Sequence, residues 1–151
     1  MTQLTIATPA PLFSLPDDTG AIISLGDFHG KKVVLYFYPK DDTPGCTAQA
    51  CNLRDHYDTL LAQGYVILGI SPDSVKKHQK FKSKYTLPFP LLSDEEHSVA
   101  LSYGVWWPKK FMGRSYEGIY RTTFIIDETG IITHIIDDVD TKEHSSQILD
   151  R

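Results

Sequence analysis

The chain has 151 residues, of which 41% are hydrophobic and 23% charged, values that are typical of one compact soluble domain. Its formal net charge is -4 and its basic residues form no patch, which argues against nucleic acid as the main partner. The longest strongly apolar run, residues 33–38, is far too short to cross a bilayer. The first residues lack the basic start and apolar stretch of a signal peptide. We therefore expect a cytoplasmic protein with a single domain over residues 1–151 and no membrane contact.

The patterning near the N-terminus predicts a β-hairpin followed by a buried strand. Two short apolar stretches, at residues 12–15 and 22–25, flank a turn sequence at 17–20, as is typical of a hairpin. Residues 33–38 are apolar at every position and rich in β-branched and aromatic side chains. Such a continuous run favours a central strand that is buried on both faces of a sheet.

A helix and a second buried strand are predicted next. Apolar residues recur every three or four positions between residues 46 and 61 and form one helical face, and Gly64 is well placed to end this helix. Residues 65–70 form another continuous apolar run that is typical of a buried strand. A strand–helix–strand unit is a crossover, so we expect the two strands to be parallel and the connection to be right-handed.

The second half is predicted to contain two more helices and a hairpin. A lysine-rich helix is expected over residues 74–85, and Ser93 with Glu96 has the form of a capping box that opens a short helix. Apolar stretches at residues 122–126 and 131–136 flank a turn sequence and indicate the hairpin. A parallel core with a later antiparallel hairpin is the thioredoxin-like arrangement of the α/β class, with a central mixed sheet flanked by helices. Composition and periodicity alone indicate only a mixed α/β domain.

The chain contains two cysteines, Cys46 and Cys51, which lie close together in the sequence. In a reducing compartment, such a pair suggests redox or metal chemistry more than a permanent disulfide. A zinc site is a poor alternative, because two thiols at this spacing are not a standard pair of zinc ligands. A thioredoxin-type disulfide reductase usually has two residues between its cysteines, whereas four separate these two.

Cys46 follows the first buried strand and falls in the first turn of the predicted helix. Thr43 suits the N-cap position of that helix, and Pro44 suits its first position. Unpaired backbone N–H groups and the helix dipole favour negative charge there, and therefore favour the nucleophilic thiolate. The alternative interpretation of Cys46 is a small buried residue on the apolar face of the helix, which its spacing also fits.

The residues around Cys46 resemble the signature of the peroxiredoxins. Pro39, Thr43 and Cys46 match the pattern P-x-x-x-T-x-x-C. The longer string at residues 37–46, FYPKDDTPGC, resembles the bacterioferritin comigratory protein, or Q-type, subfamily. The likeness continues in order through LSDE, GVW, FMG and GIYRTTFIID, and it covers nearly the whole chain. The resemblance implies a thiol peroxidase that needs no metal, haem or flavin.

The resemblance also implies roles for individual residues. Cys46 becomes the peroxidatic cysteine, and Thr43 holds the peroxide beside its sulfur. Arg121 supplies a guanidinium to the same pocket, and Pro39 forms part of the pocket wall. Without the resemblance, Thr43 is equally well a helix cap, Arg121 a surface charge and Pro39 a strand terminator. Many peroxiredoxins carry a carboxylate three residues after the catalytic cysteine to orient the arginine, whereas this chain has Gln49.

Cys51 is expected to resolve the oxidised Cys46, because some Q-type members carry a cysteine at this position. In an ideal helix, two residues five apart differ by about 140° around the axis and lie about 8.6 Å apart at Cα. A disulfide needs less than about 7 Å, so the first turns of the helix must unwind before one can form. The alternative interpretation of Cys51 is an exposed thiol with no role in the reaction.

The expected cycle reduces hydrogen peroxide or an alkyl hydroperoxide and is completed by thioredoxin or a similar dithiol reductant. The resemblance further implies that the protein is a monomer. Two other functions stay open at this point, a thioredoxin-like disulfide oxidoreductase and a redox-sensing protein that turns over slowly. Peroxide consumption in many rapid turnovers distinguishes the peroxidase from both.

Overall fold

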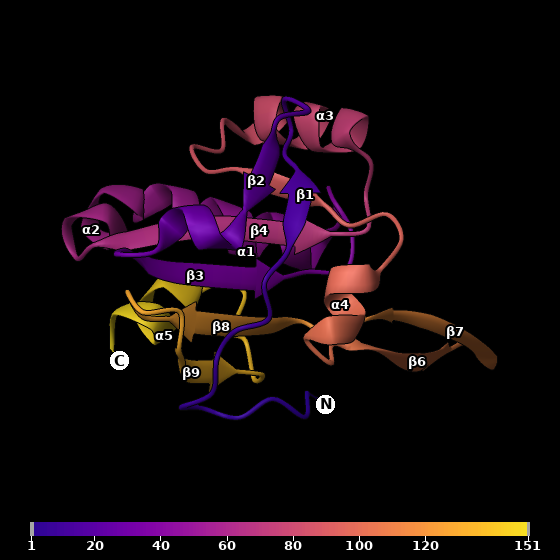
Figure 1. The fold of residues 1–151 in the computed structure, drawn as a ribbon. Coiled ribbons are helices and arrows are strands. Elements are labelled where there is room, and N and C mark those ends of the chain that lie inside the picture. The colour runs from indigo at the N-terminus through magenta and orange to yellow at the C-terminus, as the bar shows by residue number, and fades with distance from the viewer. Residues whose placement is uncertain (1, 151) are drawn as a thin grey trace.

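The computed structural model describes residues 2–150 and contains a five-stranded sheet between two outer layers (Figure 1). The strands of this sheet are β3 (Lys32–Phe37), β4 (Tyr65–Ser71), β5 (Leu91–Ser93), β8 (Thr122–Ile126) and β9 (Ile132–Ile136). They lie in the order β5-β4-β3-β8-β9. β3, β4 and β5 are parallel, while β8 runs antiparallel to β3 and β9 antiparallel to β8. The predicted mixed sheet and the predicted second hairpin, β8 with β9, are confirmed.

The central strand β3 is buried on both faces. Val33, Leu35 and Phe37 belong to one hydrophobic cluster, whereas Val34 and Tyr36 belong to the other. Successive side chains of a strand point to opposite faces of its sheet, so a strand with a core on each side must be apolar at every position. The continuous apolar run in the sequence therefore marks the centre of this sheet, as predicted.

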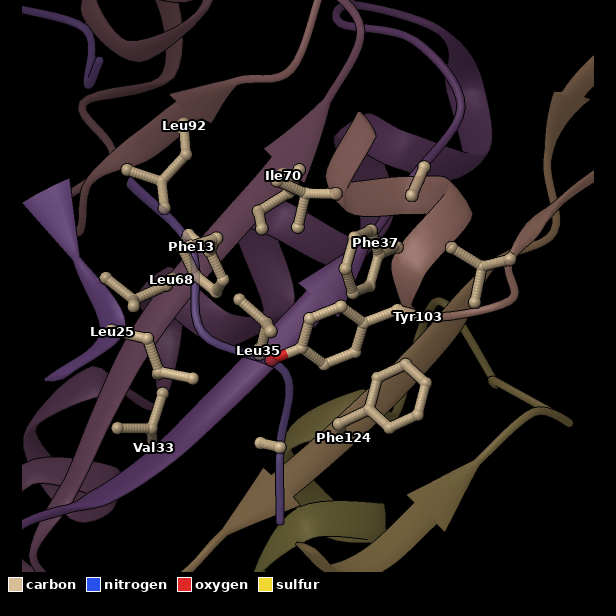
Figure 2. Packing of buried hydrophobic residues seen from close by; sticks show 14 of the residues in the cluster. Phe13, Leu25, Val33, Leu35, Phe37, Leu68, Ile70, Leu92, Tyr103 and Phe124 are labelled. Carbon is tan, nitrogen blue, oxygen red and sulfur yellow. The ribbon is translucent and has the colours of Figure 1, made fainter. Parts of the chain in front are cut away.

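One face of the sheet is covered by the N-terminal segment and by a short helix from the second half of the chain. The elements on this face are β1 (Ser14–Pro16), β2 (Ile22–Ser24), the 3-10 helix η1 (Leu25–Phe28) and α4 (Ser98–Ser102). β1 and β2 pair antiparallel, which confirms the predicted N-terminal hairpin. In the cluster that Figure 2 shows, the rings of Tyr103 and Phe124 pack edge to face with their centroids 5.1 Å apart.

The other face of the sheet is covered by four helices, and Cys46 lies on this side. These helices are α1 (Pro44–Asp55), α2 (Tyr57–Ala62), α3 (Val75–Tyr85) and α5 (His144–Leu149). Each contributes a buried side chain to the second cluster, namely Leu53, Leu60, Phe81 and Ile148. β3 and β4 pair in parallel across the connection that holds α1 and α2, as predicted for the crossover. None of the helices between residues 2 and 150 is long and apolar enough to span a membrane.

The helix predicted over residues 46–61 is in fact two helices that meet at His56. The backbone of His56 leaves the helical conformation, with φ -113° and ψ 17°. Its exposed ring places Nδ1 3.0 Å from the carbonyl oxygen of Asn52, while its own backbone N–H lies 3.3 Å from the same oxygen. The side chain therefore makes a local hydrogen bond to the backbone at the point where the helix is interrupted.

The capping box predicted at Ser93 and Glu96 is wrong. Ser93 ends β5, and its hydroxyl donates to a backbone carbonyl oxygen on a neighbouring loop instead of accepting from a helix. The first N–H groups of α4 are satisfied by Asp94, whose carboxylate accepts from Val99 at 3.3 Å and from Ala100 at 2.8 Å. α4 begins at Ser98 with His97 as its N-cap residue, so the helix starts four residues later than the S-x-x-E pattern predicted.

A further hairpin, not predicted from the pattern, projects from the body of the molecule beside α4 (Figure 1). Its strands, β6 (Trp106–Phe111) and β7 (Arg114–Ile119), pair antiparallel. The turn consists of Met112 and Gly113, whose positive φ values of 52° and 78° suit a tight two-residue hairpin turn. Most of its side chains are exposed, so no buried apolar face marks these strands in the sequence.

Candidate active site

Cys46 lies in the first turn of α1, just beyond the end of β3. Thr43 is the N-cap residue, with φ -95° and ψ 157°, and Pro44 is the first residue of the helix, as predicted. The Thr47 N–H donates to the Thr43 carbonyl oxygen at 2.8 Å, which starts the helical hydrogen bonding. Cys46 itself is 1% exposed. Its sulfur is therefore enclosed at the end of the helix where the backbone dipoles favour negative charge.

Arg121 reaches this sulfur from the opposite half of the chain. Phe37 pairs with Thr122 in the sheet, so Arg121 lies beside the end of β3. Its Nη2 lies 3.4 Å from Cys46 Sγ, and its Nη1 donates to Gln49 Oε1 at 2.7 Å. A guanidinium can only donate, which assigns the amide oxygen as its acceptor. Gln49 thus holds Arg121 without cancelling its positive charge.

The space around this guanidinium is tight. A Cβ atom at residue 45 would lie 3.1 Å from Arg121 Nη2 and 4.0 Å from Thr141 Cγ2. The first distance is shorter than most contacts between atoms that are not bonded, so Arg121 would have to shift, while the second is an ordinary van der Waals contact. Gly45 therefore allows Arg121 to approach the neighbouring cysteine.

The remaining residues predicted for the site lie along the same segment. The Thr43 hydroxyl donates to the Lys40 carbonyl oxygen at 2.9 Å and makes no bond to a helix N–H, so the predicted side-chain cap is wrong. Its hydroxyl instead closes the turn that precedes α1, and its lone pairs stay available to another donor. Pro39 is half-buried between β3 and this turn. Cys51 is half-buried on α1, and both thiols are free.

Lys109, on β6, interacts electrostatically with Arg121 and Cys46, which the sequence did not indicate. Its Nζ lies 5.2 Å above the ring of Tyr120. Burial, and then the charge of Arg121, lowers the pKa of Lys109, while Cys46 acts in the opposite direction. The projecting hairpin therefore contributes to the electrostatics of the sulfur. No pattern in the sequence links this lysine to the cysteine.

Tyr36 is a second group near the site that was not anticipated. Burial raises the pKa of Tyr36 well above its ordinary value, and the charges of Asp41 and Cys46 raise it further, so its hydroxyl stays protonated. This hydroxyl has no hydrogen-bond partner within residues 2–150. A Cβ atom at Gly69 would lie 2.8 Å from the tyrosine Cζ, so the neighbouring strand makes room for the ring. In the sequence, Tyr36 is indistinguishable from the other members of its apolar run.

Comparison with known proteins assigns the chain to a family. A family model described as the AhpC/TSA family matches residues 6–135. Relatives from Coxiella burnetii and Escherichia coli K12 are 51% and 49% identical to the chain over 149 residues. These matches cover 99% of this chain and 99% and 96% of the two relatives, of which the Escherichia coli protein is peroxiredoxin Bcp.

A solved structure agrees with this assignment. The bacterioferritin comigratory protein of Xanthomonas campestris, described for its alkyl peroxide reduction activity, superposes with a TM-score of 0.87 and 31% sequence identity. The match covers 99% of this chain and 96% of that one. The chain therefore belongs to the AhpC/TSA family, and within it to the peroxiredoxins of the Bcp or Q type, which are thiol peroxidases. The thioredoxin-like fold and the peroxidase function expected from the resemblance are confirmed.

Proposed function

We propose that this peroxiredoxin uses Cys46 as its peroxidatic cysteine. The observation that carries the proposal is the contact of the buried Cys46 sulfur with the Arg121 guanidinium, at 3.4 Å. The guanidinium and the N-terminal end of α1 both place positive potential at the sulfur, and both favour the thiolate. A thiolate is the form of cysteine that attacks a peroxide.

In the first step, the Cys46 thiolate attacks one oxygen of the hydroperoxide and the O–O bond breaks. The sulfur becomes a sulfenic acid, and the electron pair of the broken bond leaves with the other oxygen, which takes up a proton and departs as water or an alcohol. Arg121 stabilises the negative charge as it moves from the sulfur to the leaving oxygen. The Thr43 hydroxyl holds the peroxide, and Pro39, which has no N–H, lines the pocket without competing for the thiolate.

In the second step, the Cys51 thiol condenses with the sulfenic acid, which forms an intramolecular disulfide and releases water. α1 is continuous over Pro44–Asp55, and ideal helix geometry separates the two Cα atoms by about 8.6 Å, too far for a disulfide. The first turns of α1 therefore unwind. The later turns stay anchored, because Leu53 is fully buried and Arg54 donates to the Tyr85 carbonyl oxygen at 2.7 Å.

In the last step, thioredoxin or a similar dithiol protein reduces the disulfide by thiol exchange. The proposed substrates are hydrogen peroxide and alkyl hydroperoxides, and the activity described for the Xanthomonas campestris relative supports the second class. The monomeric state, the single domain and the cytoplasmic location stay predictions from the sequence.

Following NADPH oxidation with thioredoxin, thioredoxin reductase and a hydroperoxide tests the proposed cycle. We expect many rapid turnovers with hydrogen peroxide and with an alkyl hydroperoxide, and none when the peroxide is left out. A rate that depends on an added protein disulfide and not on the peroxide would assign the chain to the disulfide oxidoreductases.

Forming the disulfide is expected to unwind the first turns of α1. Oxidised protein should lose helical circular dichroism relative to reduced protein, and the amides of residues 43–53 should exchange faster with solvent. The unwound segment also gives an incoming thiolate access to a sulfur atom. Near a helix end, opening of this kind costs little compared with global unfolding.

Cys51→Ser is the control for this prediction. This variant should react once with peroxide, keep its helix, and then stall or oxidise further to the sulfinic acid. If peptide mapping finds the disulfide while exchange over residues 43–53 remains as slow as in the reduced protein, the unwinding step is wrong.

Replacing Gln49 is expected to loosen Arg121 and slow the oxidation of Cys46. Gln49→Ala removes the acceptor of one charge-assisted hydrogen bond, so we expect the second-order rate constant with peroxide to fall by about tenfold. Gln49→Glu retains an acceptor at this position and should lie nearer to wild type. Stopped-flow measurement of the oxidation step compares the two variants. Equal rates in wild type and Gln49→Ala would show that Arg121 does not need this tether.

A further inference from the structure

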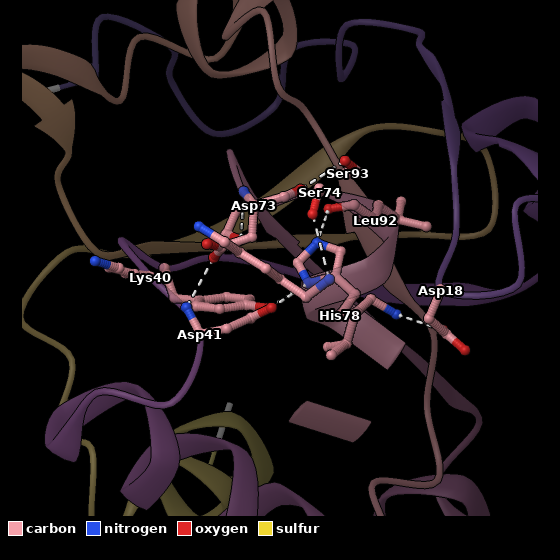
Figure 3. A network of polar contacts seen from close by, with 12 residues as sticks. Asp18, Lys40, Asp41, Asp73, Ser74, His78, Leu92 and Ser93 are labelled. Carbon is pink, nitrogen blue, oxygen red and sulfur yellow. Dashed lines mark hydrogen bonds and ion pairs between the residues drawn. The ribbon is translucent and has the colours of Figure 1, made fainter. Parts of the chain in front are cut away.

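A buried polar network, which the mechanism above does not use, joins the loop before α1 to helix α3 (Figure 3). The side chains of His78 and Asp41 are 0% and 5% exposed, and His78 Nδ1 lies 2.6 Å from Asp41 Oδ2. His78 Nε2 lies 2.9 Å from the Leu92 carbonyl oxygen. The Tyr38 hydroxyl donates to Asp41 Oδ1 at 2.6 Å. The loop is thus connected to α3 through fully enclosed groups.

The donors and acceptors of this network can be assigned. A carbonyl oxygen only accepts, so His78 Nε2 carries a proton and donates to Leu92. Burial raises the pKa of Tyr38 well above its ordinary value, so its hydroxyl is a donor as well. Asp41, Asp73 and His78 bring possible metal ligands within 4.8 Å of one another. Because both oxygens of Asp41 and both nitrogens of His78 already make hydrogen bonds, the cluster is a hydrogen-bond network and not a cation site.

Asp73 fixes the backbone of the same loop. The Asp41 N–H donates to Asp73 Oδ2 at 2.7 Å, and the Ser71 hydroxyl donates to the same oxygen at 2.7 Å. The Ser93 hydroxyl donates to the Asp73 carbonyl oxygen at 2.6 Å. Ser71 and Ser93 are the last residues of β4 and β5, so the sheet itself sets the position of Asp41.

A second, outer contact joins the loop to the end of α3. Asp42 has a positive φ of 58°, and its carboxylate accepts from Lys84 Nζ at 2.8 Å and from the Tyr85 hydroxyl at 2.9 Å. These two hydrogen bonds, that of Lys84 first, lower the pKa of Asp42. The contact is exposed and open to salt, so it restrains the loop less than the buried Asp41–His78 pair.

We propose that His78 and Asp41 are positioning residues, which fasten the turn at residues 40–43 to α3 and so hold Thr43 and the start of α1 where they receive the peroxide. Thr43 lies two residues after Asp41, and its hydroxyl closes the same turn on Lys40. α1 begins directly after this turn, with Cys46 in its first turn. The inference rests on the proposed roles of Cys46 and Cys51.

This arrangement has opposite consequences for the two chemical steps. Oxidation of Cys46 needs the ordered loop, so loosening the loop slows it. Disulfide formation needs α1 to unwind from its N-terminal end, so the same loosening makes it faster. A group that only contributed to global stability would not change the two steps in opposite directions at temperatures where the variant is folded.

Two substitutions of His78 separate its two hydrogen bonds. His78→Asn places an amide nitrogen where Nδ1 stands and can keep a hydrogen bond to Asp41. His78→Gln extends the amide towards the position of Nε2, which preserves the donor to Leu92 but removes the hydrogen bond to Asp41. The two variants match in polarity and in the number of amide groups, so they differ mainly in the contact that the proposal requires.

We expect His78→Gln to oxidise about tenfold more slowly, the equivalent of one lost hydrogen bond, and to form the disulfide faster than wild type. Amides of residues 41–47 should exchange about tenfold faster in His78→Gln, while His78→Asn stays within about twofold of wild type in all three measurements. Equal behaviour of the two variants, or unchanged exchange over residues 41–47 in His78→Gln, overturns the proposal.

A second pair of variants serves if the His78 variants do not fold. Tyr38→Phe removes one buried hydroxyl that donates to Asp41, and Tyr103→Phe removes one that donates to the Pro11 carbonyl oxygen on the other face of the sheet. Only Tyr38→Phe should change the two chemical steps and the exchange of residues 41–47, and the same changes in Tyr103→Phe contradict the proposal. Amide exchange needs no peroxide, so wild-type protein without peroxidase activity would refute the proposed function while the exchange data still decide the positioning role.

Discussion

Cys46→Ser is expected to abolish peroxide reduction. A serine hydroxyl is scarcely ionised at neutral pH and is a weak nucleophile, so neither the arginine nor the helix end can generate a reactive anion from it. The loss should be of order 10⁴-fold or more, as for removal of other catalytic nucleophiles. The substitution is nearly isosteric at a site that is 1% exposed, so the fold should persist. The NADPH-coupled assay and a single-turnover measurement of peroxide consumption check the result.

The control for this prediction is the other cysteine. Cys51→Ser keeps the nucleophile and should still consume one equivalent of peroxide, whereas Cys46→Ser should consume none. Turnover in Cys46→Ser at the wild-type rate would remove this residue from the mechanism, and the same result in Cys51→Ser would show that another thiol reduces the sulfenic acid.

The centre of the fold could be predicted from the sequence, because burial on two faces leaves a continuous apolar run. β3 and β4 are both found where such runs predict them. The hairpin of β6 and β7 could not be predicted in this way, because its side chains are mostly exposed and do not alternate between apolar and polar. The break at His56 also escaped prediction, because Leu53 and Leu60 continue the same apolar face across it.

The local part of the site could be predicted as well, whereas its long-range part could not. Thr43 and Pro44 indicate a helix start, and this places Cys46 in the first turn. The contact between Cys46 and Arg121 joins residues 75 apart and depends on the pairing of Phe37 with Thr122. Periodicity contains no information about that register, so only the family resemblance pointed to the arginine.

The buried network of Asp41 and His78 also could not be predicted from the sequence. Aspartate usually lies at the surface and histidine is of intermediate burial, so a single sequence gives no reason to place both of them in the interior. Their burial results from three strand ends that meet at one edge of the sheet, which is the edge where sites of open α/β sheets form. The motif around Cys46 was therefore visible in the sequence, while the groups that hold it in place were not.

Arg121→Met is expected to slow the oxidation of Cys46 by about 10² to 10³-fold. The variant keeps much of the side-chain length but removes the positive charge 3.4 Å from the sulfur. Without that charge, the attacking sulfur and the leaving oxygen both lose a stabilising donor. Stopped-flow oxidation measures the rate.

Arg121→Lys tests whether the charge of Arg121 or its planar geometry is needed, and Arg114→Met is the control. Arg121→Lys retains a positive charge but lacks the planar fork that contacts both Cys46 and Gln49, so its rate should fall between those of wild type and Arg121→Met. Arg114→Met removes an exposed arginine of β7 and should leave the rate unchanged. If Arg121→Met oxidises as fast as wild type, the guanidinium does not act on the sulfur. Stabilisation of the thiolate would then depend on the N-terminal end of α1.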